Sequence, residues 1–331
     1  MNITILDDSF DTVRTLQCFR KIAHHSVTIW NDHTKDVDVL AQRLKDTEVL
    51  VLMRERTPVQ SPLLERLDRL RLISQLSSHP HIDVAACTRR GVVLSSSLFP
   101  GAPEFTTLHA TAELTWALAM AAMRRIPQQM ASLKAGRWQD GIGLNLRGRT
   151  LGVFGYGRIG KVVAGYGRAF GMRVQVWGSS HSRAQATADG HGTAQTQAEF
   201  FAQCHVVSLH LRLTDSTRAI VTAQDLALMQ ADAVIVNTSR AGLIATGALE
   251  AALKAGRPGM AAIDVYDEEP VTDAFLPLLQ LDNLVCTPHI GYVERDSLES
   301  QFTEIFDQIL AWESGRPINV VNPETLGGRR D

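Results

Sequence analysis

The chain has 331 residues, of which 45% are apolar and 21% charged, a composition typical of globular proteins and not of disordered ones. At about 150 residues per domain, this length predicts roughly two domains. The 33 basic and 35 acidic residues leave a formal net charge of −2, so we expect no nucleic-acid partner. No apolar run approaches the roughly 20 residues of a membrane-spanning helix, and the first ten residues lack the features of a signal peptide. We therefore expect no membrane association and a cytoplasmic location.

The cysteines and histidines predict no metal site. The four cysteines are far apart and form no CxxC or Cys/His cluster, so neither a zinc site nor a disulfide framework is indicated. Cys87 and Cys286 lie beside apolar stretches, and we expect both to be buried thiols. The adjacent His24 and His25 have no ligand spacing and are expected at the surface.

Short apolar runs alternate with helix-compatible stretches in the first hundred residues. The runs predict four buried strands, at Asn2–Leu6, Val49–Met53, Leu70–Gln75 and Val92–Ser95. Between them, Asp36–Leu44 and Pro62–Leu67 are compatible with helices. This alternation predicts βαβ units and a doubly wound, flavodoxin-like parallel sheet.

The pattern restarts after residue 100. His109 to Arg125 predicts a long helix that is apolar on most sides, and such a helix must be covered by its own domain or by another subunit. Six further strands are predicted, at Thr150–Phe154, Arg173–Trp177, His205–Leu211, Ala233–Asn237, Met260–Val265 and Leu284–Thr287. A last helix, Asp296–Trp312, leads to the extended INVVNP, which we expect to rejoin the first domain. We therefore predict a Rossmann-type dinucleotide-binding domain over 104–291, inserted in a substrate domain formed by 1–103 and 292–331.

A glycine-rich loop, GYGRIG at 155–160, follows the strand Thr150–Phe154 and opens a helix. In this context Gly155 permits the tight turn, Gly157 lets the backbone approach a pyrophosphate, and Gly160 lets the helix pack on the sheet. The helix N-terminus offers free N–H groups and partial positive charge to the phosphates. We expect the dinucleotide to contact Gly155, Gly157, Arg158, Ile159 and Gly160.

The end of the second strand of this domain lacks the usual acid. A carboxylate about 20 residues after the loop normally binds the adenosine ribose diol, but this chain has VWGSSHSR at 176–183. Ser179, Ser180 and Arg183 could instead donate to a 2′-phosphate. This favours acceptance of NADP(H). The alternative is that these residues form a solvated turn and that NAD(H) binds through other contacts.

Three later segments each follow an apolar strand and carry an ionisable residue: NTSRAG at 237–242, DVYDEEP at 264–270 and TPHIG at 287–291. In an open parallel sheet, ligands bind beyond the carboxyl ends of the strands, so all three should face one crevice.

The motif order GYGRIG, NTSRAG, DVYDEEP, TPHIGY resembles the D-isomer-specific 2-hydroxyacid dehydrogenases, continuously from about Ala112 to Tyr292 and more loosely before. The resemblance implies hydride transfer between NAD(P)H and a small 2-keto or D-2-hydroxy acid. It implies that Arg240, Glu269 and His289 are catalytic, with Glu269 chosen over Glu268 because it directly precedes the proline. The resemblance also places residues near the cofactor, namely Leu209, His210, Thr238, Asp264 and Gly291.

The chemistry of a keto-acid reduction fits these side chains. Histidine is suited to give and take a proton at neutral pH, and a carboxylate bonded to it fixes its tautomer and favours its protonated form. Arg240 can bind a carboxylate or polarise a carbonyl through two parallel donors. Each residue also has a structural alternative: Arg240 as a surface ion-pair partner, Glu269 as a loop acid and His289 as a core imidazole. Hydride transfer needs no metal.

The first domain departs from the family. Such enzymes usually present backbone N–H groups of a glycine-bearing loop to the substrate carboxylate, but the matching stretch here, QLSSHPHID at 75–83, has no glycine. Ser78 and His79 can still offer their amides, with His79 either contacting substrate or shaping the loop. Arg54 adds charge at the entrance or is a surface residue. Arg212 stands where the family often has a proline.

We expect an unphosphorylated substrate such as glyoxylate or hydroxypyruvate. A phosphoserine-pathway dehydrogenase is possible, although no regulatory domain is expected after the last helix. The alternative class is a dinucleotide-sensing corepressor or scaffold of the same fold. A homodimer is expected through the dinucleotide domain, with the helix around Trp116 offering apolar surface.

Overall fold

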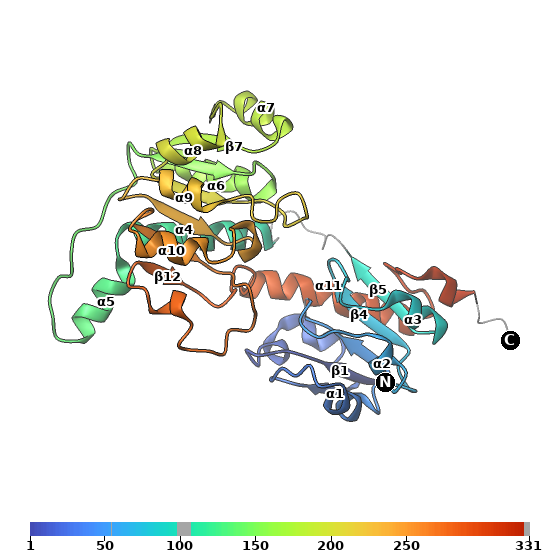
Figure 1. Cartoon of the computed structure of the whole chain (residues 1–331). Helices are drawn as coiled ribbons and strands as arrows, with labels where there is room; N and C mark the ends of the chain where they lie inside the picture. Colours follow the sequence, from blue (N-terminus) through green and yellow to red (C-terminus); the bar gives the residue numbers. More distant parts are fainter. Residues whose placement is uncertain (54, 98–106, 328–331) are drawn as a thin grey trace. The chain divides into compact units, whose positions relative to one another are not determined.

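The computed structural model describes residues 1–53, 55–97 and 107–327 and divides the chain into two compact units. Unit 1 consists of Met1–Thr106 and Arg295–Asp331, and unit 2 of Thr107–Glu294. Each unit contains one parallel sheet with helices on both faces (Figure 1). The predicted fold class, two doubly wound parallel-sheet domains, is therefore confirmed.

Unit 1 has a five-stranded sheet in the order β2-β1-β3-β4-β5, which is the flavodoxin-like order. Its strands are β1 (Asn2–Ile5), β2 (Ser26–Ile29), β3 (Val49–Val51), β4 (Leu72–Leu76) and β5 (Val93–Ser97). Its helices are α1 (Val37–Leu44), α2 (Ser61–Leu64), α3 (Val84–Arg89) and α11 (Arg295–Glu313), with short 3₁₀ turns η1 (Val13–Thr15), η2 (Gln17–Lys21) and η5 (Pro323–Leu326).

The two faces of this sheet are covered by segments from opposite ends of the chain. One face packs on α1, α2 and α3 through leucines such as Leu40, Leu44 and Leu63. The other packs on α11, whose Phe302 and Phe306 are buried among the strands, and α11 lies beside β4 in Figure 1. After α11, Val320 forms an antiparallel bridge with Ser95, so the INVVNP segment returns to β5.

Unit 2 has a seven-stranded sheet in the order β12-β11-β10-β9-β6-β7-β8, with every pair parallel. Its strands are β6 (Thr150–Phe154), β7 (Arg173–Trp177), β8 (Gly192–Thr193), β9 (Val206–Leu209), β10 (Val234–Asn237), β11 (Met260–Ile263) and β12 (Leu284–Cys286). The chain runs outward from β6 to β8, then crosses back to β9, so the order reverses beside β6. In open α/β sheets such a switch point is where ligands bind.

The helices of unit 2 form two layers. Helices α4 (Thr107–Met123) and α6 (Arg158–Ala169) cover one face, and α8 (Gln197–Gln203), α9 (Ala223–Leu228) and α10 (Ala248–Lys254) cover the other. The remaining helices are α5 (Ile126–Lys134) and α7 (Ser180–Ala188), with short turns η3 (Ala241–Leu243) and η4 (Pro277–Gln280). No helix in the described part of the chain is both long and apolar enough to span a membrane.

Three sequence-based expectations about burial are wrong. The His25 side chain, expected at the surface, is only 4% exposed. Cys286 is exposed, because it ends β12 at the edge of the sheet. Trp116 does not offer surface to a second subunit: it is 8% exposed, and its ring packs on Tyr166 and Phe170 of unit 2. The apolar helix α4 is thus largely covered by its own unit.

Candidate active site

The glycine loop after β6 has the backbone geometry that its sequence requires. Gly155 has φ +97°, and a Cβ there would lie 2.6 Å from the carbonyl oxygen of His210. At Gly160, a Cβ would lie 2.2 Å from the carbonyl oxygen of Gly155. Gly157 is different, because a Cβ there would meet nothing within 4 Å, and no side chain caps α6 at this residue. The loop therefore leaves open space before an uncapped helix N-terminus, which fits a dinucleotide pyrophosphate.

The end of β7 carries hydroxyl and guanidinium groups in place of an acid. Ser179 caps α7, its Oγ accepting from the Ser182 N–H at 3.2 Å, and Ser180 is the first residue of that helix. Arg183 lies one turn further, with its guanidinium 4.8 Å from the centre of the Trp177 ring. The stacking holds this cation beside the end of β7.

Leu209 and His210 follow at the end of β9, next to the glycine loop. His210 donates its backbone N–H to Phe154 at 2.7 Å, and its Nε2 lies 2.9 Å from Ser208 Oγ. Burial lowers the pKa of His210 to about 4, so the ring is neutral at neutral pH. This neutral ring lines the sheet edge without adding charge beside the loop.

Thr238 and Arg240 lie beyond the end of β10. The Thr238 and Thr115 hydroxyls hydrogen-bond at 2.6 Å, which ties this loop to α4. The Asn237 side chain donates to the Arg240 carbonyl at 2.9 Å, and Arg240 Nη1 donates to the Ser239 carbonyl at 2.7 Å. Arg240 itself is exposed. Its backbone is thus fixed while its guanidinium remains accessible.

Asp264, directly after β11, is fully buried and organises the loop that carries His289. Its carboxylate accepts from the Thr287 hydroxyl at 2.6 Å and from the backbone N–H groups of Ile290 and Gly291 at 2.8 Å each. Burial raises the pKa of Asp264, against the lowering effect of these hydrogen bonds. A Cβ at Gly291 would lie 3.2 Å from Asp264 Oδ2, so a side chain at 291 would crowd this anchor.

Glu269 and His289 form a hydrogen-bonded pair. Glu269 Oε2 lies 2.5 Å from His289 Nδ1, and Oε1 accepts from the Tyr266 N–H at 2.9 Å. Burial alone would raise the pKa of Glu269, but the hydrogen bonds from His289 and Tyr266 and the charges of His289 and Arg240 outweigh it and lower that pKa. The carboxylate is therefore ionised at neutral pH.

This pair sets up proton transfer at one ring atom. With Nδ1 bonded to the carboxylate, Nε2 is the atom available to exchange a proton, and among the described residues none hydrogen-bonds to it. The His289 side chain is 30% exposed, which leaves it within reach of a small molecule. The charge of Arg240 acts on Glu269, so the structure gathers an acid/base pair and a cation at the carboxyl ends of β10, β11 and β12.

The predicted substrate loop of unit 1 lies beside an acid. Ser78 donates its hydroxyl to Glu55 at 2.6 Å, and Ser77 before it has φ +82°. Nδ1 of His79 is buried without a hydrogen-bond partner among the described residues. Arg54 lies outside the described residues. The substrate roles of Ser78, His79 and Arg54 stay predictions.

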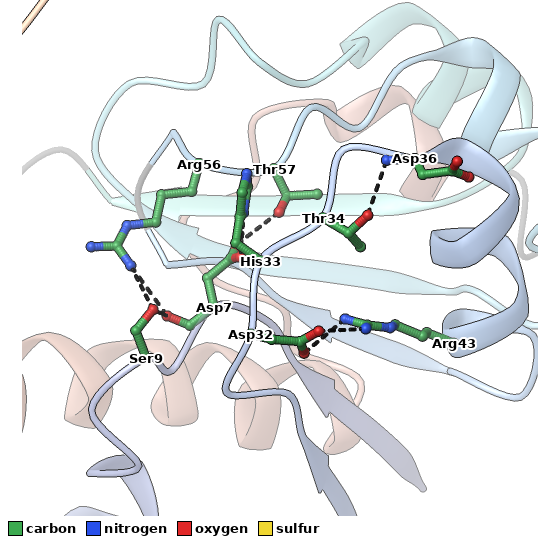
Figure 2. A network of polar contacts seen from close by, with 9 residues as sticks. All are labelled: Asp7, Ser9, Asp32, His33, Thr34, Asp36, Arg43, Arg56 and Thr57. Carbon is green, nitrogen blue, oxygen red and sulfur yellow. Dashed lines mark hydrogen bonds and ion pairs between the residues drawn. The ribbon is translucent and has the colours of Figure 1, made fainter. Parts of the chain in front are cut away.

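A polar network fixes the neighbouring loops at the same edge of this sheet (Figure 2). The buried Asp7, after β1, faces His33 Nδ1 at 2.8 Å through Oδ1 and accepts from the Thr57 hydroxyl at 2.7 Å through Oδ2. Arg56 donates to the Asp7 carbonyl at 3.4 Å and to Ser9 Oγ at 3.3 Å. The segments after β1, β2 and β3 are thereby held together.

Two groups of residues around the pair were not found by sequence reasoning. Thr111 donates to the Gly291 carbonyl at 2.9 Å, and Thr115 contacts Thr238, so α4 positions both loops. Tyr266 donates its hydroxyl to the Thr287 carbonyl at 3.0 Å, and the Tyr292 ring packs edge-on against His289. The threonines had a usable signal, two hydroxyls four residues apart on a largely apolar helix.

Comparison with known proteins identifies a family. Residues 116–291 match the model described as D-isomer specific 2-hydroxyacid dehydrogenase, NAD binding domain. The chain is 32% identical over 320 residues to a glyoxylate reductase from Aeropyrum pernix, which covers 93% of this chain and 92% of that protein. It is 37% identical over 273 residues to the D-3-phosphoglycerate dehydrogenase of Methanocaldococcus jannaschii, covering 82% of this chain but only 50% of that one. The chain thus spans about half the length of that relative.

Solved structures include close neighbours. A crystal structure from Ralstonia solanacearum, provisionally assigned as a D-3-phosphoglycerate dehydrogenase oxidoreductase, superposes with a TM-score of 0.91 at 49% identity and covers 98% of both chains.

Proposed function

Because this chain belongs to the D-isomer specific 2-hydroxyacid dehydrogenase family, we propose that it transfers a hydride between NAD(P)H and a small 2-keto or D-2-hydroxy acid. The observation that carries the proposal is the Glu269–His289 pair, with Arg240 close enough for its charge to act on Glu269. In this proposal, unit 2 binds the dinucleotide and unit 1 is the substrate domain.

His289 is the general acid and base. During reduction, Nε2 of the protonated ring gives its proton to the carbonyl oxygen of the substrate, and in the reverse direction it takes the hydroxyl proton. Glu269 balances the charge of the protonated ring and keeps Nδ1 as the donor to its carboxylate. Arg240 binds the substrate carboxylate and polarises the carbonyl through its fork of N–H donors.

The residues that would hold the cofactor lie on the loops already described. Gly155, Gly157, Arg158, Ile159 and Gly160 would surround the pyrophosphate, and Leu209, His210, Thr238, Asp264 and Gly291 would face the nicotinamide side. The bound nicotinamide supplies the hydride. Since Asp264 already accepts three hydrogen bonds from the 287–291 loop, we assign it mainly to positioning that loop.

We infer that NADP(H) is accepted. No acid occurs from Gly178 to Ala188, so nothing in this stretch repels a 2′-phosphate, and Ser179, Ser180 and the stacked Arg183 can donate to one. Ser179→Asp tests this cleanly, because aspartate is as good a helix N-cap as serine and adds only the charge. The KM for NADPH should rise at least tenfold, while the KM for NADH stays constant or falls. A strong preference of the wild type for NADH would contradict the inference.

The substrate we propose is unphosphorylated, of the glyoxylate or hydroxypyruvate type. Some relatives are named glyoxylate reductase and others D-3-phosphoglycerate dehydrogenase, so their names support an unphosphorylated and a phosphorylated substrate equally. In unit 1, the Glu55 carboxylate contacts Ser78, which with His79 and Arg54 we propose for substrate binding. A phosphate dianion beside this carboxylate would be repelled.

We also propose a homodimer formed through unit 2. Its α5 and the segment after it project from the body of the unit (Figure 1) and carry large exposed apolar side chains, namely Ile126, Met130, Leu133, Trp138 and Ile142. Trp138 is 77% and Ile142 91% exposed, which is unusual unless a partner covers them. Sedimentation of the wild type beside Ile142→Asp measures whether this surface joins two copies.

The deciding experiment follows NADPH and NADH oxidation with glyoxylate, hydroxypyruvate, its 3-phosphate, pyruvate and an aromatic 2-keto acid. We expect turnover with the small unphosphorylated acids, and a loss of roughly 10²–10⁴-fold in His289→Ala, the usual contribution of a positioned acid/base. Unchanged turnover in that variant would refute the assignment of His289. Tight cofactor binding with no turnover on any acid would favour a dinucleotide sensor.

A further inference from the structure

Three acids along α11 face the N-terminal segment of unit 1, and two of them have matching donors. Glu299 accepts from the backbone N–H groups of Gln17 and Cys18, and Asp307 pairs with Lys21 at 2.5 Å. The third, Glu313, is the last residue of α11 and faces a pair of histidines. Its partners are therefore imidazoles and not a permanent cation.

The donor atoms of this group converge. His25 Nε2 lies 3.4 Å from Glu313 Oε2, and the rings of His24 and His25 lie with their centroids 3.8 Å apart. One ligand atom from each of the three side chains falls within 4.8 Å of the others. Two ligands of a tetrahedral ion at bond lengths near 2.1 Å are separated by about 3.4 Å, so one pair is already at coordinating distance.

His25, the histidine nearest to Glu313, has a buried ring nitrogen that is available as a metal ligand. Its side chain is only 4% exposed, and Nε2 has no hydrogen-bond partner among the described residues. Nδ1 of the same ring lies 3.5 Å from the amino nitrogen of Met1, which leaves Nε2 as the atom that faces the carboxylate.

The end of α11 lacks a compensating positive charge of its own. A carboxylate at a helix C-terminus adds negative charge to the negative end of the helix dipole, and the last turn of α11 contains no basic residue. A bound cation would offset both the charge of the Glu313 carboxylate and the negative end of the helix dipole. Ca²⁺ and Mg²⁺ prefer sets of oxygen ligands, whereas two imidazoles and one carboxylate suit Zn²⁺ and the neighbouring transition metals.

We propose that His24, His25 and Glu313 form a binding site for a divalent transition metal such as Zn²⁺, with the fourth position open to water. The ion would join the turn between η2 and β2 to the end of α11, and so fasten the N-terminal part of unit 1 to the helix that completes its core. The sequence predicted no metal here because the third ligand comes from the other end of the chain.

The test is a zinc titration of the purified wild type against a competing chromophoric chelator, beside His24→Ala and Glu313→Gln. His24 and Glu313 are partly exposed, so their replacement should not impair folding. Each variant should lose one equivalent of bound zinc, or bind it at least tenfold more weakly. Even residues that only hydrogen-bond to a metal ligand change metal affinity by about 10–100-fold, so loss of a ligand should do at least as much. His191→Ala, which removes a histidine of unit 2, is the matched control and should bind zinc as the wild type does.

A second readout separates this site from zinc bound elsewhere, for example by the Glu269–His289 pair. Zinc should raise the Tm of the wild type and of His289→Ala, but not that of His24→Ala. Equal stoichiometry and affinity in the wild type, His24→Ala and Glu313→Gln would overturn the proposal.

Discussion

Glu269 connects three groups through one carboxylate: His289 Nδ1, the Tyr266 N–H and, by its charge, Arg240. Glu269→Gln keeps the shape but removes the charge that balances a protonated His289. We expect kcat to fall by about 10²-fold or more, as for a positioned acid/base that loses its partner, with a smaller change in KM. Steady-state kinetics measure both constants.

The adjacent acid is the control for that substitution. Glu268 has the same charge and directly precedes Glu269, but it makes no hydrogen bond with His289. Glu268→Gln should therefore stay within about twofold of the wild type. If the two variants were equally impaired, the assignment of Glu269 would be wrong.

His210 predicts a pH dependence of stability. Burial lowers its pKa to about 4 in the folded protein, against about 6.5 in an unfolded chain. Between these pH values the unfolded chain binds a proton that the folded chain does not, so the free energy of unfolding falls as the pH drops from 6.5 towards 4. In His210→Asn this contribution is absent, and urea titrations at several pH values should show a shallower fall. An identical pH slope in both proteins would contradict the burial of a neutral ring.

The sequence predicted the ionisable residues of the site better than the residues that position them. Arg240, Glu269 and His289 stand in short motifs directly after apolar strands, so strand prediction alone brings them to one sheet edge. Thr111 and Thr115 lie on a helix that is distant in sequence, and their contacts with Gly291 and Thr238 exist only once α4 packs on the sheet. The loop at Ser78 was predicted by resemblance alone, and Arg54 only from its place after a strand.

At the level of elements, substitutions at three glycines of the loop and of helix α6 distinguish the residues needed for packing from those needed for ligand binding. A Cβ at Gly160 meets a backbone oxygen, whereas at Gly157 and Gly165 it meets nothing within 4 Å. Gly160→Ala should destabilise the protein by about 1–3 kcal/mol, as overpacking does. Gly165→Ala, on the exposed side of α6, should stabilise it by about 0.5–1 kcal/mol.

Gly157→Ala completes this series. The substitution should leave the Tm of the cofactor-free protein unchanged, because the space is open, but weaken dinucleotide binding at least tenfold if the pyrophosphate approaches there. Thermal unfolding with and without NADPH measures both effects. Normal cofactor affinity in Gly157→Ala would place the dinucleotide elsewhere.

The strands that the sequence missed are those with the least burial. All strands with continuous apolar runs were predicted to within a few residues. β2 was missed because it is an edge strand whose exposure alternates, so its sequence SVTI gives no continuous apolar run. β8 has only two residues and was too short to produce a pattern.

At the scale of the whole molecule, we expect a core substitution in α11 to destabilise unit 1 and to leave unit 2 folded, because α11 belongs to unit 1. Phe306 is fully buried and packs on Phe19 and Phe302, all in unit 1. Phe306→Ala should destabilise unit 1 by about 3–5 kcal/mol. Hydrogen exchange followed by peptide mass spectrometry should show lost protection in β1, β3 and β4, with β6, β9 and β10 of unit 2 still protected. Equal loss in both units would mean that they do not unfold separately.

The placement of α11 also bears on the order in which the chain acquires its structure during synthesis. Unit 2 is one continuous stretch and can fold as soon as residue 294 has left the ribosome. The strands of unit 1 emerge first, yet the helix that covers one face of their sheet is translated after the whole of unit 2. Throughout that interval the nascent sheet exposes a hydrophobic face, and this is the period in which a chaperone would have most to bind.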